Sequence, residues 1–169
     1  RFFKTGNYKI ETAIAYDEGG HYHTNVVITS PDGKSSLVEL NEPGNRIYSS
    51  VVLALNNTTV LIPAISDKGN RYYELDLTTN KLTTGDEKNY SWFDPNELTE
   101  AFTGTNGEVY CRTLSGLARV NVSAKKVEDV FTFNWCGINR GKVSDLKFIE
   151  CTGDTIIMFG QTSGDSEYE

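Results

Sequence analysis

The sequence contains only three cysteines, and their spacing is unlike that of the common cysteine-based sites. Cys111, Cys136 and Cys151 include no C-x-x-C pair, so the sequence predicts neither a zinc site nor a dithiol redox site. An odd number of cysteines cannot all pair within one chain. A bridge between Cys111 and Cys136 is one alternative, but the apolar residues before Cys111 and Cys151 favour free, buried thiols.

The chain also lacks a long apolar run and an excess of basic residues. No stretch of about 18 apolar residues occurs, so we expect no transmembrane segment in it. Its 16 Lys and Arg residues are outnumbered by 23 Asp and Glu residues, which gives a net charge of −7. Such a chain has no basic field to attract phosphate groups. We therefore predict that it binds neither nucleic acid nor an anionic membrane surface.

The beginning and the length of the chain lead to a further expectation. It starts with Arg1-Phe2-Phe3, without an initiator Met and without the apolar stretch of a signal peptide. We therefore expect either that a leader has been removed or that this is a piece of a larger protein. Its 169 residues suit one domain. We predict a single domain over residues 1–169 that contacts the rest of a larger protein.

Motifs for the common enzyme chemistries are absent. The sequence has no P-loop, no G-x-G-x-x-G after a predicted strand and no H-E-x-x-H, so we predict no catalytic residue and no cofactor. His21 and His23 share one face of a predicted strand, where two imidazoles are candidate metal ligands. We favour exposed histidines and no metal site. Three acidic pairs beside turns are candidate acid–base pairs but are more typical of solvated acids: Asp86–Glu87, Asp94 with Glu97, and Glu128–Asp129.

Short runs of β-branched and aromatic residues alternate with turn residues along most of the chain, and this pattern predicts an all-β protein. The dipeptides Asp32-Gly33 and Asn106-Gly107 predict hairpin turns, because glycine accepts the positive φ that tight turns need. Strands are predicted over residues 8–16, 22–30, 36–40, 47–55, 59–65, 71–77, 81–84, 98–102, 108–113, 117–122, 126–133, 143–149 and 155–159.

The predicted strands form groups that resemble one another. In three segments a strand, a polar turn and a second strand follow in the same order, and Val60, Val109 and Ile156 occupy the same place in each, at steps of 49 and 47 residues. The repeat is therefore about 45–50 residues long, with up to four short strands in each unit. We predict units at 1–45, 46–90, 91–137 and 138–169, the last of them incomplete.

A four-stranded antiparallel unit of this length is the size of a propeller blade, which buries its faces by stacking on its neighbours. The segments Tyr73–Lys81 and Asn106–Tyr110 resemble β-propeller repeats of bacterial extracellular proteins. Gly116–Asn121, Phe131–Cys136 and Val143–Leu146 resemble, more narrowly, propeller regions beside extracellular solute-binding domains of Firmicutes lipoproteins. The resemblance implies a β-propeller-like array of four-stranded antiparallel blades. About three and a half blades fit the chain, so a partial propeller is expected, and a β-sandwich is the alternative.

Aromatic residues in the connections between units are the candidate ligand-binding residues: Tyr90, Trp92 and Trp135. Exposed aromatic rings in loops stack on sugars or peptides, whereas buried ones fill the gaps between blades. We expect a non-catalytic, extracellular or cell-surface module that binds or acts as a scaffold, with a small carbohydrate or peptide as its ligand. The alternative is part of a propeller-based carbohydrate-active hydrolase or lyase, which needs two convergent carboxyl groups, one with a raised pKa.

Overall fold

The computed structural model describes residues 2–42, 44–49, 51–96, 98–103, 108–113, 116–132, 142–152 and 155–163. It is built from antiparallel strands, and its described part contains one helix, α1 (Glu87–Tyr90), of four residues. The all-β prediction is confirmed. None of the helices in the described residues is long and apolar enough to cross a membrane.

The first sheet has four strands in the order β1-β2-β3-β4. These strands are β1 (Phe2–Thr5), β2 (Tyr8–Tyr16), β3 (Tyr22–Thr29) and β4 (Ser35–Leu40). The predicted hairpin at Asp32-Gly33 is confirmed: Gly33 has a φ of +84° and donates its N–H to the carbonyl of Ser30 at 2.9 Å. β1 was not predicted, because the Arg1–Thr5 segment is too short to show an alternating pattern. The second predicted turn, at Asn106-Gly107, lies outside the described residues.

The second sheet consists of β5 (Ile47–Tyr48), β6 (Leu53–Ala54), β7 (Thr59–Ser66), β8 (Gly69–Asp76) and β9 (Lys81–Thr84). The predicted single strand over 47–55 is wrong, since β5 and β6 pair separately with the two ends of β7. The break lies opposite Pro63, which has no N–H to donate to a neighbouring strand. The Ser49 hydroxyl instead donates to the Pro63 carbonyl at 2.7 Å.

The third sheet has the order β10-β11-β12-β13, with β10 (Leu98–Thr103), β11 (Val109–Thr113), β12 (Gly116–Asn121) and β13 (Lys126–Thr132). β14 (Lys142–Thr152) and β15 (Thr155–Ser163) form a further hairpin. Val60 and Val109 both lie at the start of the second strand of a hairpin and are 1% and 7% exposed, as the repeat predicts. Ile156 holds the corresponding place in β15.

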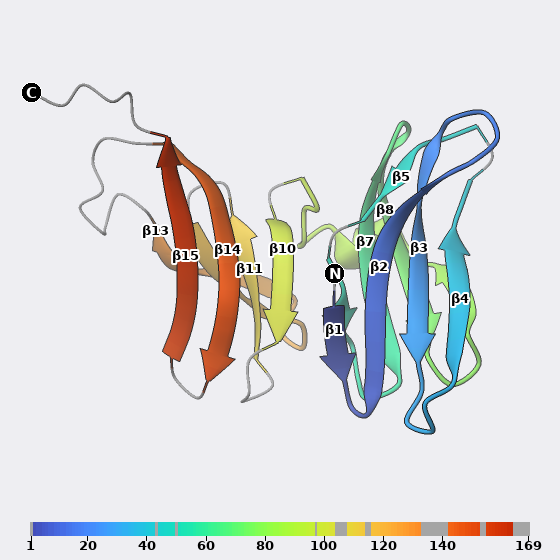
Figure 1. The fold of residues 1–169 in the computed structure, drawn as a ribbon, viewed down its shortest axis with the longest axis horizontal. Helices are drawn as coiled ribbons and strands as arrows, with labels where there is room; N and C mark the ends of the chain where they lie inside the picture. Colours follow the sequence, from blue (N-terminus) through green and yellow to red (C-terminus); the bar gives the residue numbers. More distant parts are fainter. Residues whose placement is uncertain are drawn as a thin grey trace, which may run out of the picture.

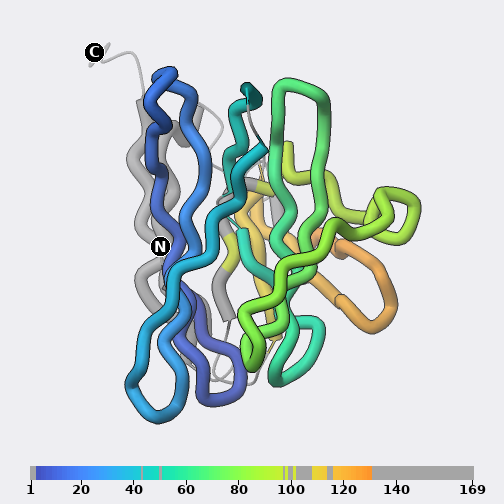
Figure 2. Tube along the Cα trace, turned by 90° about the vertical axis from the view of Figure 1, so that its right-hand side faces the viewer, coloured from blue at the N-terminus to red at the C-terminus, as the bar shows by residue number. Residues whose placement is uncertain are grey.

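The second sheet lies behind the first in Figure 1, and the third sheet lies beside them, with β10 next to β1 (Figures 1 and 2). Five consecutive residues of β7, Val60 to Ala64, are buried. Since successive strand residues point to opposite faces, such a run requires cover on both sides. One apolar cluster extends through all three sheets. β3 lies against β5 and β1 against β10, and Thr24 bonds Ile47 and Ser49 across the first contact.

The arrangement is therefore a stack of open antiparallel sheets, each formed by strands that are consecutive in the chain. Such a stack agrees with the coarse prediction of antiparallel sheets packed face to face. Both propeller blades and the layers of a sandwich are built in this way.

Candidate functional site

The connection between the second and third sheets, residues 85–96, contains the two described aromatic candidates. It begins with α1, whose first turn is capped by Asp86: the carboxylate accepts the N–H of Lys88 at 3.0 Å. Capping of this kind satisfies an N–H that a short helix leaves unbonded. Asp86 is therefore a helix cap, and the connection has a defined conformation that places Tyr90 and the residues after it.

Tyr90 is held against the second sheet. Its ring stacks on that of Tyr72 with the centroids 5.7 Å apart, and its hydroxyl donates to a carboxylate oxygen of Glu74 at 2.5 Å. Burial and this neighbouring carboxylate raise the pKa of Tyr90 to about 12, since both disfavour the phenolate. The ring and the hydroxyl of Tyr90 thus both have partners within the protein. Tyr90 therefore holds the connection in place and leaves little surface free for a ligand.

The sequence left two roles open for the aromatic residues of this connection: stacking on a ligand at the surface, and filling space inside the protein. Phe93 and Trp92 differ in which of these roles they suit. Phe93 is fully buried and belongs to the apolar cluster, and its carbonyl accepts the hydroxyl of Tyr72 at 2.8 Å. Trp92 is half-buried and meets the Phe93 ring edge-on, with centroids 5.8 Å apart. Its indole N–H donates to the Asn89 carbonyl at 3.1 Å. Phe93 is therefore part of the buried core, while Trp92 packs against that core and keeps part of an apolar ring in solvent.

A cluster of a carboxylate and two amides follows Trp92 in the chain. One oxygen of Asp94 accepts three N–H groups: the side-chain amide of Asn70 at 3.2 Å, and the backbone and side-chain amides of Asn96, each at 2.9 Å. Although desolvation opposes it, these bonds lower the pKa of Asp94. Asn96 also donates to the Asn70 side-chain oxygen at 2.9 Å. Sequence reasoning missed the part of Asn70, because Asn70 lies in β8, which is distant from Asp94 in the sequence.

A pocket of about 360 Å³ lies elsewhere, near the ends of the strands of the third sheet. Arg119 on its rim forms ion pairs with Glu108 at 3.5 Å and with Glu128 at 2.6 Å. Successive residues of a strand point to opposite faces of the sheet, yet here such residues line one pocket together. The pocket therefore lies at an end of the sheet. Sequence reasoning did not find this pocket, and neither Tyr90 nor Trp92 lines it. Its lining residues are Ala54, Glu108, Val109, Arg119, Val120, Asn121, Val122 and Ser123. Trp135 lies outside the described residues.

The carboxyl groups show one common trend. In the part of the chain that the structure describes, each carboxyl whose pKa departs from its ordinary value has a lowered pKa. The strongest case is Glu128, where hydrogen bonds from Arg119 and Lys126 lower the pKa to about 2. A lowered pKa keeps a carboxyl ionised, which is the opposite of what a general acid needs. The groups concerned are Asp17, Asp32, Asp67, Asp76, Asp94 and Glu128.

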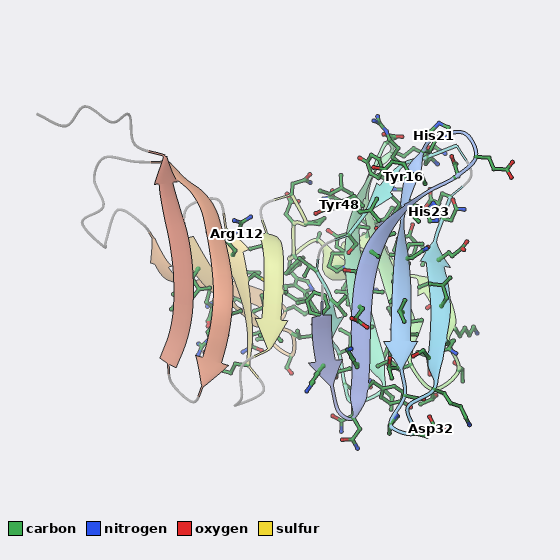
Figure 3. All side chains as sticks on the ribbon, in the orientation of Figure 1. Tyr16, His21, His23, Asp32, Tyr48 and Arg112 are labelled. Atoms are coloured by element: carbon green, nitrogen blue, oxygen red, sulfur yellow. The ribbon has the colours of Figure 1, made fainter. Side chains whose placement is uncertain are left out.

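The two histidines lie in different environments (Figure 3). His21 is partly exposed, and its Nδ1 lies 3.3 Å from a carboxylate oxygen of Asp17 in the β2–β3 turn. The expectation that both are exposed is wrong for His23, which is 7% exposed and lies on β3, between β2 and β4 in the first sheet. In the described ranges, no three His, Cys, Asp or Glu side chains are grouped so as to hold a metal ion. Cys111 is a free, buried thiol whose pKa burial raises.

No known protein family and no curated protein matches the sequence. One solved structure is similar: the extracellular domain of a putative one-component system from B. thetaiotaomicron. The match covers 86% of this chain and 25% of that one, with 15% identity and a TM-score of 0.29. This chain thus spans a quarter of that protein's length, and a TM-score this low transfers neither fold nor function.

Proposed function

We propose that this chain is a non-catalytic binding module in which the 85–96 connection recognises a small carbohydrate or peptide. The observation that carries the proposal is the partly exposed ring of Trp92, two residues before the bonded cluster of Asp94, Asn96 and Asn70. A flat apolar ring offers contact area at little entropic cost, and carboxylate and amide groups fixed by mutual hydrogen bonds orient hydroxyl or peptide groups.

The stack of sheets supports a scaffold role for the rest of the chain. We propose that the sheets are successive blades of a partial β-propeller with units at 1–45, 46–90, 91–137 and 138–169. Each of these boundaries falls in a connection between two sheets. A propeller of this kind presents the connections between its blades on a rigid support. An extracellular or cell-surface location, with contacts to a larger protein, belongs to the same proposal and rests on the resemblance of the sequence motifs.

The lowered pKa values of the shifted carboxyl groups support binding over catalysis. A glycosidase needs one carboxyl that is protonated at neutral pH. The described carboxyl groups with shifted pKa values are instead stabilised as anions by N–H and O–H donors. Ionised carboxyl groups of this kind are suited to accept hydrogen bonds from a ligand.

The proposal is tested by titrating the chain with a panel of neutral oligosaccharides and short peptides while following tryptophan fluorescence. We expect a ligand of one of these classes to quench the emission. Trp92→Ala should then weaken binding at least about fivefold, the effect of losing roughly 1 kcal/mol of stacking energy. Leu37→Ala, which removes a more exposed apolar side chain on β4 (55% exposed), is the control and should leave the affinity unchanged.

Three results would decide against the proposal. Absence of binding across the whole panel would leave only the scaffold role. Binding that is insensitive to Trp92→Ala but lost in Arg119→Ala would move the site to the pocket of the third sheet. Release of new reducing ends from the oligosaccharides would show that the chain is part of a hydrolase.

A further inference from the structure

The pocket of about 360 Å³ at the end of the third sheet is lined by apolar and polar groups in equal number. The apolar residues are Ala54 of β6, Val109, Val120 and Val122. The polar residues are Glu108, Arg119, Asn121 and Ser123. Polar and apolar residues alternate along the chain here, so the two kinds of group come from opposite faces of the sheet. The pocket therefore offers a ligand an apolar wall and a polar wall.

The polar wall belongs to an ion-pair network whose charges cancel. The guanidinium of Arg119 pairs with Glu108 at 3.5 Å and with Glu128 at 2.6 Å. Lys126 pairs with the other oxygen of Glu128 at 2.9 Å. Two positive and two negative side chains thus neutralise one another, and the network holds no excess charge that would attract a charged ligand.

The same network still offers hydrogen bonds. An arginine side chain has five N–H donors, and the two ion pairs of Arg119 use two of its nitrogen atoms. The side-chain oxygen of Asn121 accepts the N–H of Ala124 at 2.9 Å, while its NH₂ group carries two donors. The Ser123 hydroxyl both donates and accepts. Hydroxyl groups of a ligand match this set, because they bond to it without breaking an ion pair.

Both walls have a defined conformation. Val109 and Val120 lie opposite each other in the strand register and are 7% and 5% exposed. The turn after β12 is fixed by the bond from Ala124 to Asn121 and by the N–H of Lys125, which donates to the Val122 carbonyl at 3.2 Å. A site formed before the ligand arrives avoids the entropic cost of ordering its side chains on binding.

We propose that this pocket binds one ring of a neutral sugar. A pyranose ring has C–H groups on its faces and hydroxyl groups around its edge, which match the apolar and the polar wall. Ligand pockets measure about 300–1,000 Å³, and 360 Å³ lies at the small end of this range. A single ring is therefore the fitting size. The site is separate from the 85–96 connection, and the inference does not rest on the function proposed for that connection.

A free amino acid is the competing ligand of similar size. Its carboxylate matches Arg119, and its ammonium group matches Glu108. To bind in this way it would have to replace the pair that these two residues already form, and its own two charges would lose their hydration. A neutral sugar meets neither cost, so the network favours the sugar.

Titrations of the ¹⁵N-labelled chain followed by NMR test the ligand class. The neutral probes are D-glucose, D-galactose, D-mannose, D-xylose and N-acetyl-D-glucosamine, and the charged probes are D-glucuronate and L-leucine. We expect at least one neutral sugar to shift the backbone amide signals of Val109, Val120 and Ser123 saturably, and both charged probes to bind at least tenfold more weakly. No saturable shift with any neutral sugar, or tighter binding of a charged probe, would overturn the inference.

Arg119→Gln tests the polar wall and should weaken binding of the sugar at least tenfold. Arg46→Gln is the matched control. Arg46 is similarly exposed (54% against 45% for Arg119) and also forms an ion pair, with Asp67 at 3.0 Å. It precedes β5, which pairs with the end of β7 opposite to the one that pairs with Ala54. An unchanged affinity in Arg119→Gln, or an equal loss in both variants, would overturn the inference.

Ala54→Leu keeps the test decisive if Arg119→Gln fails to fold. Ala54 is partly exposed, so the larger side chain has room to occupy the pocket, and the ion pairs of the polar wall stay intact. Binding should again weaken at least tenfold. Wild-type affinity in Ala54→Leu would show that the sugar does not occupy this pocket.

The indole N–H signal of Trp92 separates this inference from the proposed function. Trp92 does not line the pocket, so a sugar bound there should leave its signal unshifted and bind equally well to Trp92→Ala. That result supports the pocket whether or not oligosaccharides bind the 85–96 connection. A sugar that shifts the Trp92 signal, and whose binding is lost in Trp92→Ala but kept in Arg119→Gln, would support the proposed function and overturn the present inference.

Discussion

Phe93 and Trp92 offer the sharpest test of how the second and third sheets are held together. They are adjacent in the chain, yet Phe93 is fully buried whereas Trp92 is only partly buried against the apolar cluster. Phe93→Ala leaves the backbone in place, so the hydrogen bond from Tyr72 to the Phe93 carbonyl is retained. The loss is confined to the ring and to the cavity that it leaves in the apolar cluster.

The expected magnitude follows from this difference in burial. Removal of a fully buried phenylalanine ring costs about 3–5 kcal/mol. At roughly 2–4 °C per kcal/mol for a chain of this size, the Tm should fall by about 6–20 °C. Trp92→Ala removes a ring that is only partly covered and should cost about 1 kcal/mol, chiefly the edge-on contact with Phe93.

Urea unfolding followed by far-UV circular dichroism measures both variants on one scale, and Leu37→Ala on the exposed surface of β4 serves as the control with little expected change. The slope of the unfolding free energy against urea should stay constant, so that shifts in midpoint report stability alone. The reasoning is refuted if Trp92→Ala destabilises the chain as much as Phe93→Ala does. Trp92 would then be the residue that fills the gap between the sheets, and no described aromatic residue of the connection would remain as a binding candidate.

Three further predictions concern single groups. Val109→Ala should lower the unfolding free energy by about 1–3 kcal/mol in urea titrations, because it removes buried methyl groups; an unchanged midpoint would contradict the burial of Val109 between sheets. Glu128 has a pKa of about 2 against an ordinary value of 4.5, so its ion pairs stabilise the fold above pH 4.5, and this contribution is lost as the pH falls toward 2. Glu128→Gln should flatten the pH dependence of the urea midpoint in that window, and an identical acid profile would show that these exposed pairs contribute nothing. Cys111 should react with a thiol reagent only after unfolding, since its thiol is buried and its pKa is raised; rapid labelling of Cys111 in the native chain, located by peptide mapping, would contradict this.

Local chemistry in the sequence determined the fold class and many of the strands. The alternation of residues 8–16 predicted β2 with the bounds that it has, Tyr8–Tyr16. Asp32-Gly33 predicted its turn because only a residue tolerant of positive φ suits that position. The equivalence of Val60 and Val109 was also visible, since each follows a strand and a polar turn. These features depend on neighbours a few residues away, which the sequence displays directly.

Only the tertiary structure decided which side chains and edges are covered. Pro63 split the predicted 47–55 strand because the partner it fails to bond comes from a different part of the chain. His23 is buried although it lies next to a turn, and Phe93, not Trp92, is the fully buried aromatic residue of the 85–96 connection. Cover of this kind is set by contacts between segments that are distant in sequence, and the alternation within one strand carries no information about them.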